Sequence, residues 1–251
     1  MKLTINTSFQ ANASSQSLLI LVDSEHVQNT ADSYQINDLD KTIEAVQFKA
    51  GLNETLTLIG TVKACGNTTL VGIGKAEELQ PAKLAKIAQT IIKASQKKFQ
   101  QISIDISTLP QELHYLFALS LTQASYAFDE YKSKKNEFAL QQVNFIATQS
   151  VLTEQQLQLI SAIQNGQNYT RDLGNRPGNI CFPEYLAEQA LALEAEFPDL
   201  LKVTVLDEQQ MADLGMGAFL AVSKGSDRPG RIITLEYQAH RSEAPVVLVG
   251  K

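Results

Sequence analysis

Short apolar segments alternate with amphipathic segments along the first 150 residues. Strand-like segments, either wholly apolar or alternating, occupy residues 17–22, 55–59, 68–73, 101–106 and 142–147. Helices are expected between them, beginning near Asp38, Pro81 and Pro110, because apolar side chains then recur on one helical face. Strands and helices in alternation are typical of an α/β layer architecture. The pattern therefore predicts an α/β domain over residues 1–150.

The pattern changes near residue 150, where a Gln-rich segment with a narrow apolar stripe begins. Thr153 and Gln156 have the spacing of a capping box, in which each side chain bonds the backbone of the other residue. The apolar stripe that follows consists of Leu157, Ile160 and Ile163. A stripe this narrow suits a helix that touches two domains lightly. We expect a linker helix over residues 151–172.

A second α/β unit is predicted from residue 173 onward. Pro183 opens a helix, Asp207 caps a shorter one that ends at Gly215, and residues 202–206 and 231–237 are strand-like. These few elements, together with the last apolar run, are too few to close a sheet that is covered on both faces. Residues 173–251 are therefore expected to be the incomplete beginning of a second α/β domain.

The last residues form a continuous apolar run that ends in a charged side chain. Val246 to Val249 have the pattern of a strand buried on both faces, and Gly250 and Lys251 follow it. Functional groups in α/β sheets gather just beyond the carboxyl ends of the strands. Lys251 is therefore the candidate site residue, although a solvated terminal lysine is the ordinary alternative.

Composition narrows the classes of function. The chain has 251 residues and a net charge of −6, which argues against a general nucleic-acid or anionic-membrane surface. No apolar segment is long enough to be a signal peptide or to span a bilayer. Cys65 and Cys181 are too few for a disulfide framework. We expect a cytoplasmic protein.

Two local features resemble functional motifs, but their residues favour a structural interpretation. The segment Val71-Gly-Ile-Gly-Lys75 follows a strand, but it lacks the longer glycine spacing and the hydroxyl residue of a phosphate loop. A tight strand-to-helix turn is the better interpretation. His114 lies within an apolar helix and is interpreted as a packing residue.

Several segments after residue 168 combine unusual residues in a fixed order. They are Arg171-Asp-Leu-x-Asn175-x-Pro177-x-Asn179, Pro183-x-x-Leu186-Ala187, Leu214-Gly-Met-Gly-x-Phe-Leu-Ala-Val222 with Gly225-Ser226, Leu235-x-Tyr237, and Val249-Gly250-Lys251. Their order and spacing closely resemble the leucyl (cytosol) aminopeptidase family. Earlier segments resemble it more loosely, through residues 71–75 and 126–132. The resemblance implies a macro-domain-like α/β N-terminal domain, a linker helix, and the first part of an α/β aminopeptidase catalytic domain.

The resemblance also assigns a role to Lys251. In that family the strand ending in Val-Gly-Lys continues as Gly-x-Thr-Phe-Asp, and its lysine is a ligand of one of two adjacent divalent metal ions, Mn or Zn. The other metal ligands and the catalytic Lys and Arg belong to motifs that this chain does not contain. The resemblance therefore places a metal ligand at Lys251 and no catalytic residue within residues 1–251. We expect the chain to be a truncated enzyme, inactive by itself.

The implied activity is release of N-terminal amino acids, leucine preferred, from peptides with a free N-terminus. Two cations would activate a bridging water, bind the α-amine and polarise the scissile carbonyl. The family also implies a homohexamer. Two alternatives concern the N-terminal domain, namely a DNA-binding or architectural role and a purely oligomer-organising role. The negative net charge counts against DNA binding, whereas a steep salt dependence of DNA affinity would favour it.

Overall fold

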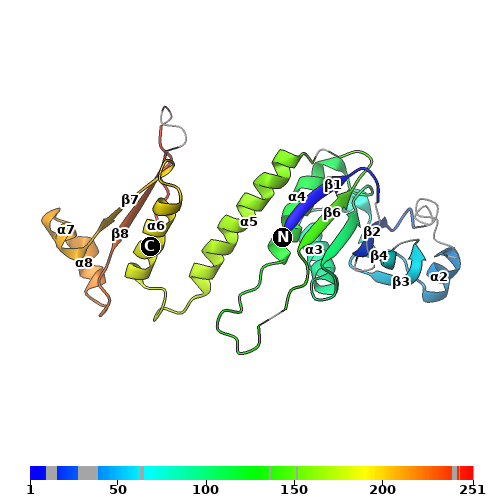
Figure 1. Ribbon diagram of the computed structural model, residues 1–251, viewed down its shortest axis with the longest axis horizontal. Helices are drawn as coiled ribbons and strands as arrows, with labels where there is room; N and C mark the ends of the chain where they lie inside the picture. Colours follow the sequence, from blue (N-terminus) through cyan, green and yellow to red (C-terminus); the bar gives the residue numbers. More distant parts are fainter. Residues whose placement is uncertain are drawn as a thin grey trace. The chain divides into compact units, whose positions relative to one another are not determined.

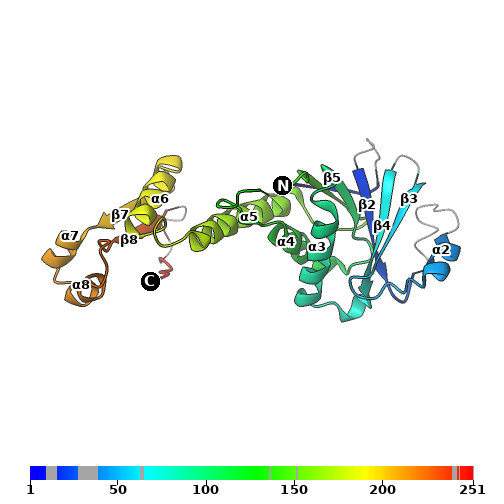
Figure 2. The same ribbon diagram turned by 90° about the horizontal axis from the view of Figure 1, so that it is seen from below.

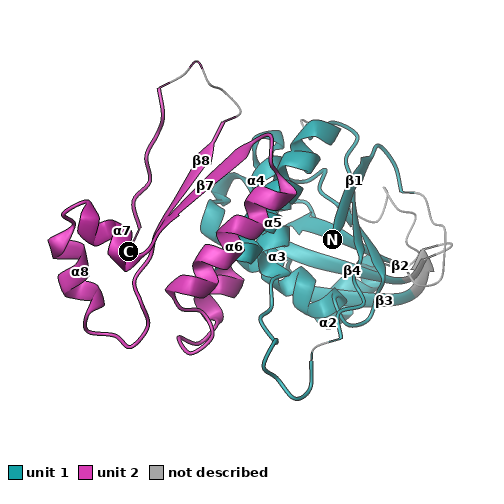
Figure 3. Ribbon diagram, turned by 60° about the vertical axis from the view of Figure 1, so that its left-hand side comes forward, with its two compact units in different colours: residues 1–170 teal, residues 171–251 magenta. Residues whose placement is uncertain are grey.

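The chain folds into two compact units, residues 1–170 and 171–251 (Figure 3). Most of the predicted linker lies in helix α5 (Glu154–Asn175), whose residues through Thr170 belong to the first unit. Thr153 and Gln156 form the predicted capping box at its start: the Gln156 N–H donates to Thr153 Oγ1 at 3.2 Å, and the Thr153 N–H donates to Gln156 Oε1 at 2.9 Å. The computed structural model describes residues 1–9, 16–27, 39–62, 65–135, 137–150, 152–238, 242 and 244–250.

The described part of the first unit is built on a six-stranded sheet with the order β1-β6-β5-β2-β4-β3 (Figure 1). Every pairing is parallel except that of β3 with β4. Five of the strands match the predicted segments, whereas the first was not predicted from the sequence. The strands are β1 (Lys2–Asn6), β2 (Gln16–Asp23), β3 (Thr55–Val62), β4 (Cys65–Gly74), β5 (Gln101–Asp105) and β6 (Gln142–Ile146).

Helices α3 (Pro81–Ser95) and α4 (His114–Ala124) lie side by side against one face of this sheet (Figures 1 and 2). Pro81 is the first residue of α3, as predicted, because its missing N–H and fixed φ suit that position. The helix predicted from Pro110 begins instead with a short 3-10 turn, η2 (Gln111–Leu113), before α4. Helix α2 (Leu39–Val46) lies beside β3, and its predicted cap, Asp38, lies outside the described residues.

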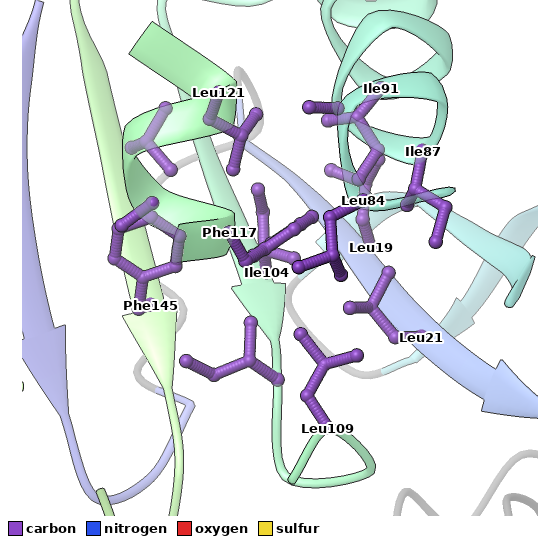
Figure 4. Close-up of a cluster of buried hydrophobic side chains, with 14 of the residues drawn as sticks. Leu19, Leu21, Leu84, Ile87, Ile91, Ile104, Leu109, Phe117, Leu121 and Phe145 are labelled. Carbon is purple, nitrogen blue, oxygen red and sulfur yellow. The ribbon is translucent and has the colours of Figure 1, made fainter. Parts of the chain in front are cut away.

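The largest cluster of buried side chains lies between the sheet and the α3–α4 pair (Figure 4). The rings of Phe117 and Phe145 meet edge to face, with centroids 6.4 Å apart. Burying side chains of this size contributes roughly 1.5–3 kcal/mol each, before conformational entropy is subtracted. The cluster includes Leu19, Leu21, Leu84, Ile87, Ile91, Ile104, Phe117, Leu121 and Phe145.

The opposite face of the sheet is divided into an apolar half and a polar half. Over β2, β4 and β3 it is apolar and packs against Leu39 and Phe48. Over β1, β6 and β5 it is polar except at Ile146, at the end of β6, which joins the apolar cluster. There the buried Asn144 Oδ1 accepts hydrogen bonds from Thr4 Oγ1 at 2.8 Å and from Asn6 Nδ2 at 2.7 Å. Because these bonds exist in only one register, they fix the alignment of β1 on β6.

The segment Val71–Lys75 is a strand end and a tight turn, as interpreted from the sequence. Gly74 ends β4 with φ of +71°, a conformation that glycine adopts without strain. Its neighbour Lys75 precedes the 3-10 turn η1 (Ala76–Glu78), and the Lys75 Nζ lies 2.7 Å from Glu25 Oε1. The ammonium group is therefore paired with a carboxylate.

The second unit contains a two-stranded antiparallel sheet and three helices in its described part. The sheet pairs β7 (Leu201–Leu206) with β8 (Ile232–Tyr237). The helices are α6 (Pro183–Glu196), α7 (Glu208–Asp213) and α8 (Gly217–Ser223). Asp207 forms the predicted cap of α7, accepting from the Gln210 N–H at 2.8 Å. None of the described helices of either unit is long and apolar enough to cross a membrane.

The strand predicted at Val246–Val249 is wrong for this structure. Residues 244–250 have no regular secondary structure, and Val249 is 93% exposed. An apolar run becomes a strand only when another strand binds its backbone groups and its side chains are covered. Neither condition is met for this run among the described residues, where the sheet of the second unit contains β7 and β8 alone.

Thr68 provides a test of how the apolar half of the sheet is stabilised. It is buried opposite Leu18 and Leu58, and its hydroxyl has no hydrogen-bond partner among the described residues. Replacing it by the isosteric valine removes a buried unsatisfied group, so Thr68→Val is expected to raise the free energy of unfolding by about 1 kcal/mol. Urea titration measures this. The matched control is Thr69→Val, because the Thr69 hydroxyl meets Thr57 Oγ1 at 3.2 Å on the exposed side. A less stable Thr68→Val variant contradicts the prediction.

His114 is buried, and its ring is held in one tautomer. Nε2 lies 3.1 Å from the Leu109 carbonyl oxygen, which only accepts, so Nε2 carries the proton. Nδ1 therefore accepts from the Ser150 hydroxyl at 3.0 Å, and Ser150 Oγ accepts from the Leu152 N–H at 3.1 Å. Burial lowers the pKa of His114 below its ordinary value. The neutral imidazole is thus part of the packing, as interpreted from the sequence.

The first unit should therefore lose stability in mild acid. The unfolded imidazole gains a proton below a pH of about 6.5, while the folded one resists protonation, so stability present above that pH falls as pH decreases toward the lowered pKa. The slope is at most about 1.4 kcal/mol per pH unit. His114→Gln should show a smaller stability loss between pH 7.5 and 5.5 in urea titrations. His26→Gln, at a largely exposed position, should retain the wild-type loss. Equal losses in His114→Gln and wild type would exclude this role.

Candidate functional site

One carboxylate, that of Glu208, joins the helices and the strand around residues 214–226, the segment that contains Gly215, Gly217 and Gly225. Glu208, in the first turn of α7, accepts the Gly230 N–H at 2.9 Å and the Ser223 hydroxyl at 2.7 Å, both through Oε1. Ser223 is the last residue of α8, and Gly230 lies just before β8. A single oxygen thus holds the start of α7, the end of α8 and the entry to β8 together.

These contacts keep Glu208 ionised. The Gly230 N–H, the Ser223 hydroxyl and the nearby charges of Arg231 and Lys224 lower the pKa of Glu208. A carboxylate with a lowered pKa is a poor general acid near neutral pH. Its hydrogen bonds and its pKa both indicate a structural tie.

Gly230 is required at its position by the packing around it. A Cβ atom there would lie 2.9 Å from Ser223 Cβ and 3.3 Å from Phe219 Cε1. The Gly230 backbone is therefore pressed against α8, which lets its N–H reach Glu208. Gly230 lies four residues beyond the motif at residues 214–226.

Two arginines connect the entry of β8 to the start of α6. The Arg228 guanidinium carbon lies 4.2 Å from the centroid of the Phe182 ring, a cation–π contact. Arg231 Nη2 lies 3.8 Å from Glu184 Oε1. The entry of β8 and the start of α6, which are far apart in sequence, therefore belong to one packed region.

The predicted metal ligand, Lys251, lies outside the described residues. Among the residues that are described, no three or more His, Cys, Asp or Glu side chains come close enough together to hold a metal ion. The run that leads to Lys251 is exposed and unpaired. The role of Lys251 as a metal ligand therefore stays a prediction.

Glu208 and Gly230 were not identified from the sequence. The cap formed by Asp207 and Gln210 was recognised, but Glu208 within it was not separated from an ordinary acidic residue at a helix start. The sequence offers one indication of Gly230: this glycine follows Pro229 and comes just before the strand-like residues 231–237. A glycine at such a place indicates a constraint on the backbone, but it does not show that Glu208 accepts the Gly230 N–H.

Two family models match the chain in order. The cytosol aminopeptidase family N-terminal domain matches residues 19–135, and the cytosol aminopeptidase family catalytic domain matches residues 168–251. The chain belongs to the cytosol aminopeptidase family. The resemblance inferred from residues 169–251 is confirmed by these matches.

Curated relatives match the whole chain. A protein named probable cytosol aminopeptidase from Acinetobacter baumannii strain AYE is 67% identical over 251 residues, which are 100% of this chain and 52% of the relative. The chain therefore spans about half the length of this curated relative.

Solved structures share the fold. A tomato leucine aminopeptidase mutant aligns with a TM-score of 0.78 at 19% identity, covering 94% of this chain and 50% of that structure. The bottromycin maturation enzyme BotP, solved in complex with Mn, aligns with a TM-score of 0.68 at 18% identity, covering 89% of this chain and 45% of that structure. At these identities the comparison confirms the mixed α/β fold.

The packing at Gly230 can be tested by a single methyl group. Gly230→Ala is expected to destabilise the second unit by about 1–3 kcal/mol, because the added carbon must displace α8 and lengthen the bond to Glu208. Hydrogen exchange of the β8 and α8 amides measures the effect. Gly178→Ala is the control, since a Cβ at Gly178 meets no atom within 4 Å. Equal exchange rates in the two variants contradict the assignment.

Proposed function

We propose that this chain supplies the N-terminal domain and the beginning of the catalytic domain of a leucyl aminopeptidase-type metallo-exopeptidase. The observation that carries the proposal is the ordered match of both family domains, together with 67% identity to a relative along the whole chain. The enzyme would release N-terminal amino acids, leucine preferred, from peptides with a free N-terminus. We further propose that it acts in the cytoplasm as a homohexamer.

The chemistry needs two divalent cations, Mn or Zn, which this chain cannot hold by itself. A single lysine is one donor, and the described residues contain no group of His, Cys, Asp or Glu that could bind a cation. We therefore assign the remaining ligands to sequence that the longer relatives have beyond the aligned region. The manganese in the BotP structure supports a metal in a protein of this fold.

Lys251 is proposed as the metal ligand that this chain contributes. An amine binds a cation only in its neutral form, and an adjacent positive charge favours loss of its proton. Residues 173–250 would serve as scaffold for this lysine.

The proposal predicts that the 251-residue chain and a longer polypeptide differ in peptidase activity. The 251-residue chain with added Mn or Zn should not hydrolyse leucine p-nitroanilide, because its ligand set is incomplete. The same sequence extended to the length of its relatives should hydrolyse it. Measurable hydrolysis by the 251-residue chain overturns the proposed division of the site.

A substitution then tests Lys251 in the extended polypeptide. Lys251→Met should lower kcat/KM by at least about 100-fold and weaken metal binding measured by calorimetry, because an amine that binds the metal is lost. Lys224→Met, at an exposed position in the same unit, is the matched control and should change neither. Unchanged metal affinity in Lys251→Met would remove the lysine from the proposed site.

A further inference from the structure

Helix α3 of the first unit carries its lysines along one face and contains no acidic residue. Its buried side chains pack against the sheet and α4, which leaves the other face to solvent. Positions three, four or seven residues apart fall on one line along such a face. From Lys83 to Lys93 this line extends about 15 Å, because each helical residue rises about 1.5 Å. We name it the lysine stripe, and it consists of Lys83, Lys86, Lys93 and, in the turn after the helix, Lys97.

The lysine stripe lies in a part of the chain without negative charge. Residues 79–104 contain five lysines and no Asp or Glu, although the whole chain has a net charge of −6. Helix α4, beside α3, has no Asp, Glu, Lys or Arg. Lys83 Nζ lies 3.4 Å from Glu78 Oε2, whereas the exposed Lys86 and Lys93 make no ion pair with any described residue. The outer face of α3 is therefore a local positive surface on a negatively charged chain.

The charges of the stripe do not stabilise the helix as a whole. A positive charge is unfavourable near the N-terminus of a helix, and the first turn of α3 has no acidic residue. Glu78 offsets this effect for Lys83 but not for Lys86. Lysines three or four residues apart also repel each other, as Lys83 and Lys86 do. A local rule that is broken without a compensating contact indicates a use for the charge outside the fold.

The side chains around the stripe narrow the class of anionic partner. Arginine supplies the bidentate contacts to phosphates and to bases, and residues 1–170 contain no Arg. Aromatic side chains on which bases could stack are absent from α3. The large apolar side chains of α3 are buried, so this helix has none to insert into a lipid surface. What the stripe offers is a line of ammonium groups, which bind phosphate as point charges.

We propose that the lysine stripe binds a linear inorganic polyphosphate chain that lies along α3. Such a chain presents negative charges on a line and carries neither bases nor acyl groups, so it matches a surface that offers charge alone. Its binding also relieves the repulsion between neighbouring lysines. The stripe lies within residues 19–135, which match the N-terminal domain of the family, and the inference does not depend on the proposed peptidase activity.

Binding of fluorescently labelled polyphosphate to the 251-residue chain, in about 50 mM salt, tests the proposal. A triple variant of the stripe should raise the dissociation constant at least about 10-fold. It should also reduce the slope of log affinity against log salt by about 2, at roughly 0.7 for each lysine that meets a phosphate. The substitutions are Lys86→Gln, Lys93→Gln and Lys97→Gln.

The matched control removes the same charge from another exposed segment of the first unit. It should leave the dissociation constant and the salt slope unchanged. Its substitutions are Lys132→Gln, Lys134→Gln and Lys135→Gln. In urea titrations the stripe variant should be no less stable than wild type, because glutamine is a good helix former and the repulsion is removed. Lower stability of the stripe variant would assign these lysines to the fold and contradict the proposal.

Three binding results would overturn the proposal. One is a wild-type chain that does not bind polyphosphate, and another is an equal loss of affinity in the stripe variant and the control variant. The third is tighter binding of a single-stranded oligonucleotide of equal charge, or of anionic vesicles, which would make the partner a nucleic acid or a membrane. The polypeptide extended to the length of the relatives should bind polyphosphate with the same affinity. Loss of binding in that polypeptide would also contradict the proposal.

Discussion

Burial of one sheet face under α3 and α4 is the constraint on which the first unit depends. Strands β1, β2, β4, β5 and β6 carry apolar side chains on that face, and helices α3 and α4 pack an apolar surface against them, with Phe117 and Phe145 in edge contact. Once this face is closed, the opposite face is free to differ along its length. It uses apolar packing beside α2 and a polar network around Asn144 beside β1. The same sheet therefore gains stability from one half of that face and alignment from the other.

The second unit achieves order by other means. Its sheet has two strands in the described residues, and few of its side chains are fully buried, with Ala187, Ala190 and Met211 among them. Polar ties take the place of a large core. Glu208 joins three elements, the Glu194 carboxylate accepts the Val203 N–H of β7, and Arg228 and Arg231 contact the start of α6. Because such ties depend on precise distances, the unit tolerates little change at residues such as Gly230.

Local patterns predicted most elements, and tertiary partners decided the exceptions. Pro81, Thr153 and Asp207 were located correctly because helix starts have short-range chemical signals. Strand β1 was missed since Leu3 and Ile5 alone give a weak alternation, and its pairing with β6 depends on residues far along the chain. The run at Val246 failed for the opposite reason, a strong apolar signal without a strand to pair with. In the second unit, the family could be recognised from motifs in the sequence. The hydrogen bonds of Glu208 could not be predicted, because their partners Ser223 and Gly230 lie 15 and 22 residues away and only the fold brings them together.

The pairing of β1 with β6 has a consequence for how the protein is made. The Thr4 hydroxyl can donate to Asn144 only after the ribosome has added 140 more residues. At a synthesis rate of about 5–20 residues per second, the first strand stays unpaired for roughly 7–28 s while the ribosome produces its neighbour. A strongly apolar edge would be an aggregation hazard during that time. Strand β1 has only two apolar residues, Leu3 and Ile5, and its other face carries Thr4 and Asn6. This composition lowers the tendency of the unpaired strand to aggregate before it pairs with β6.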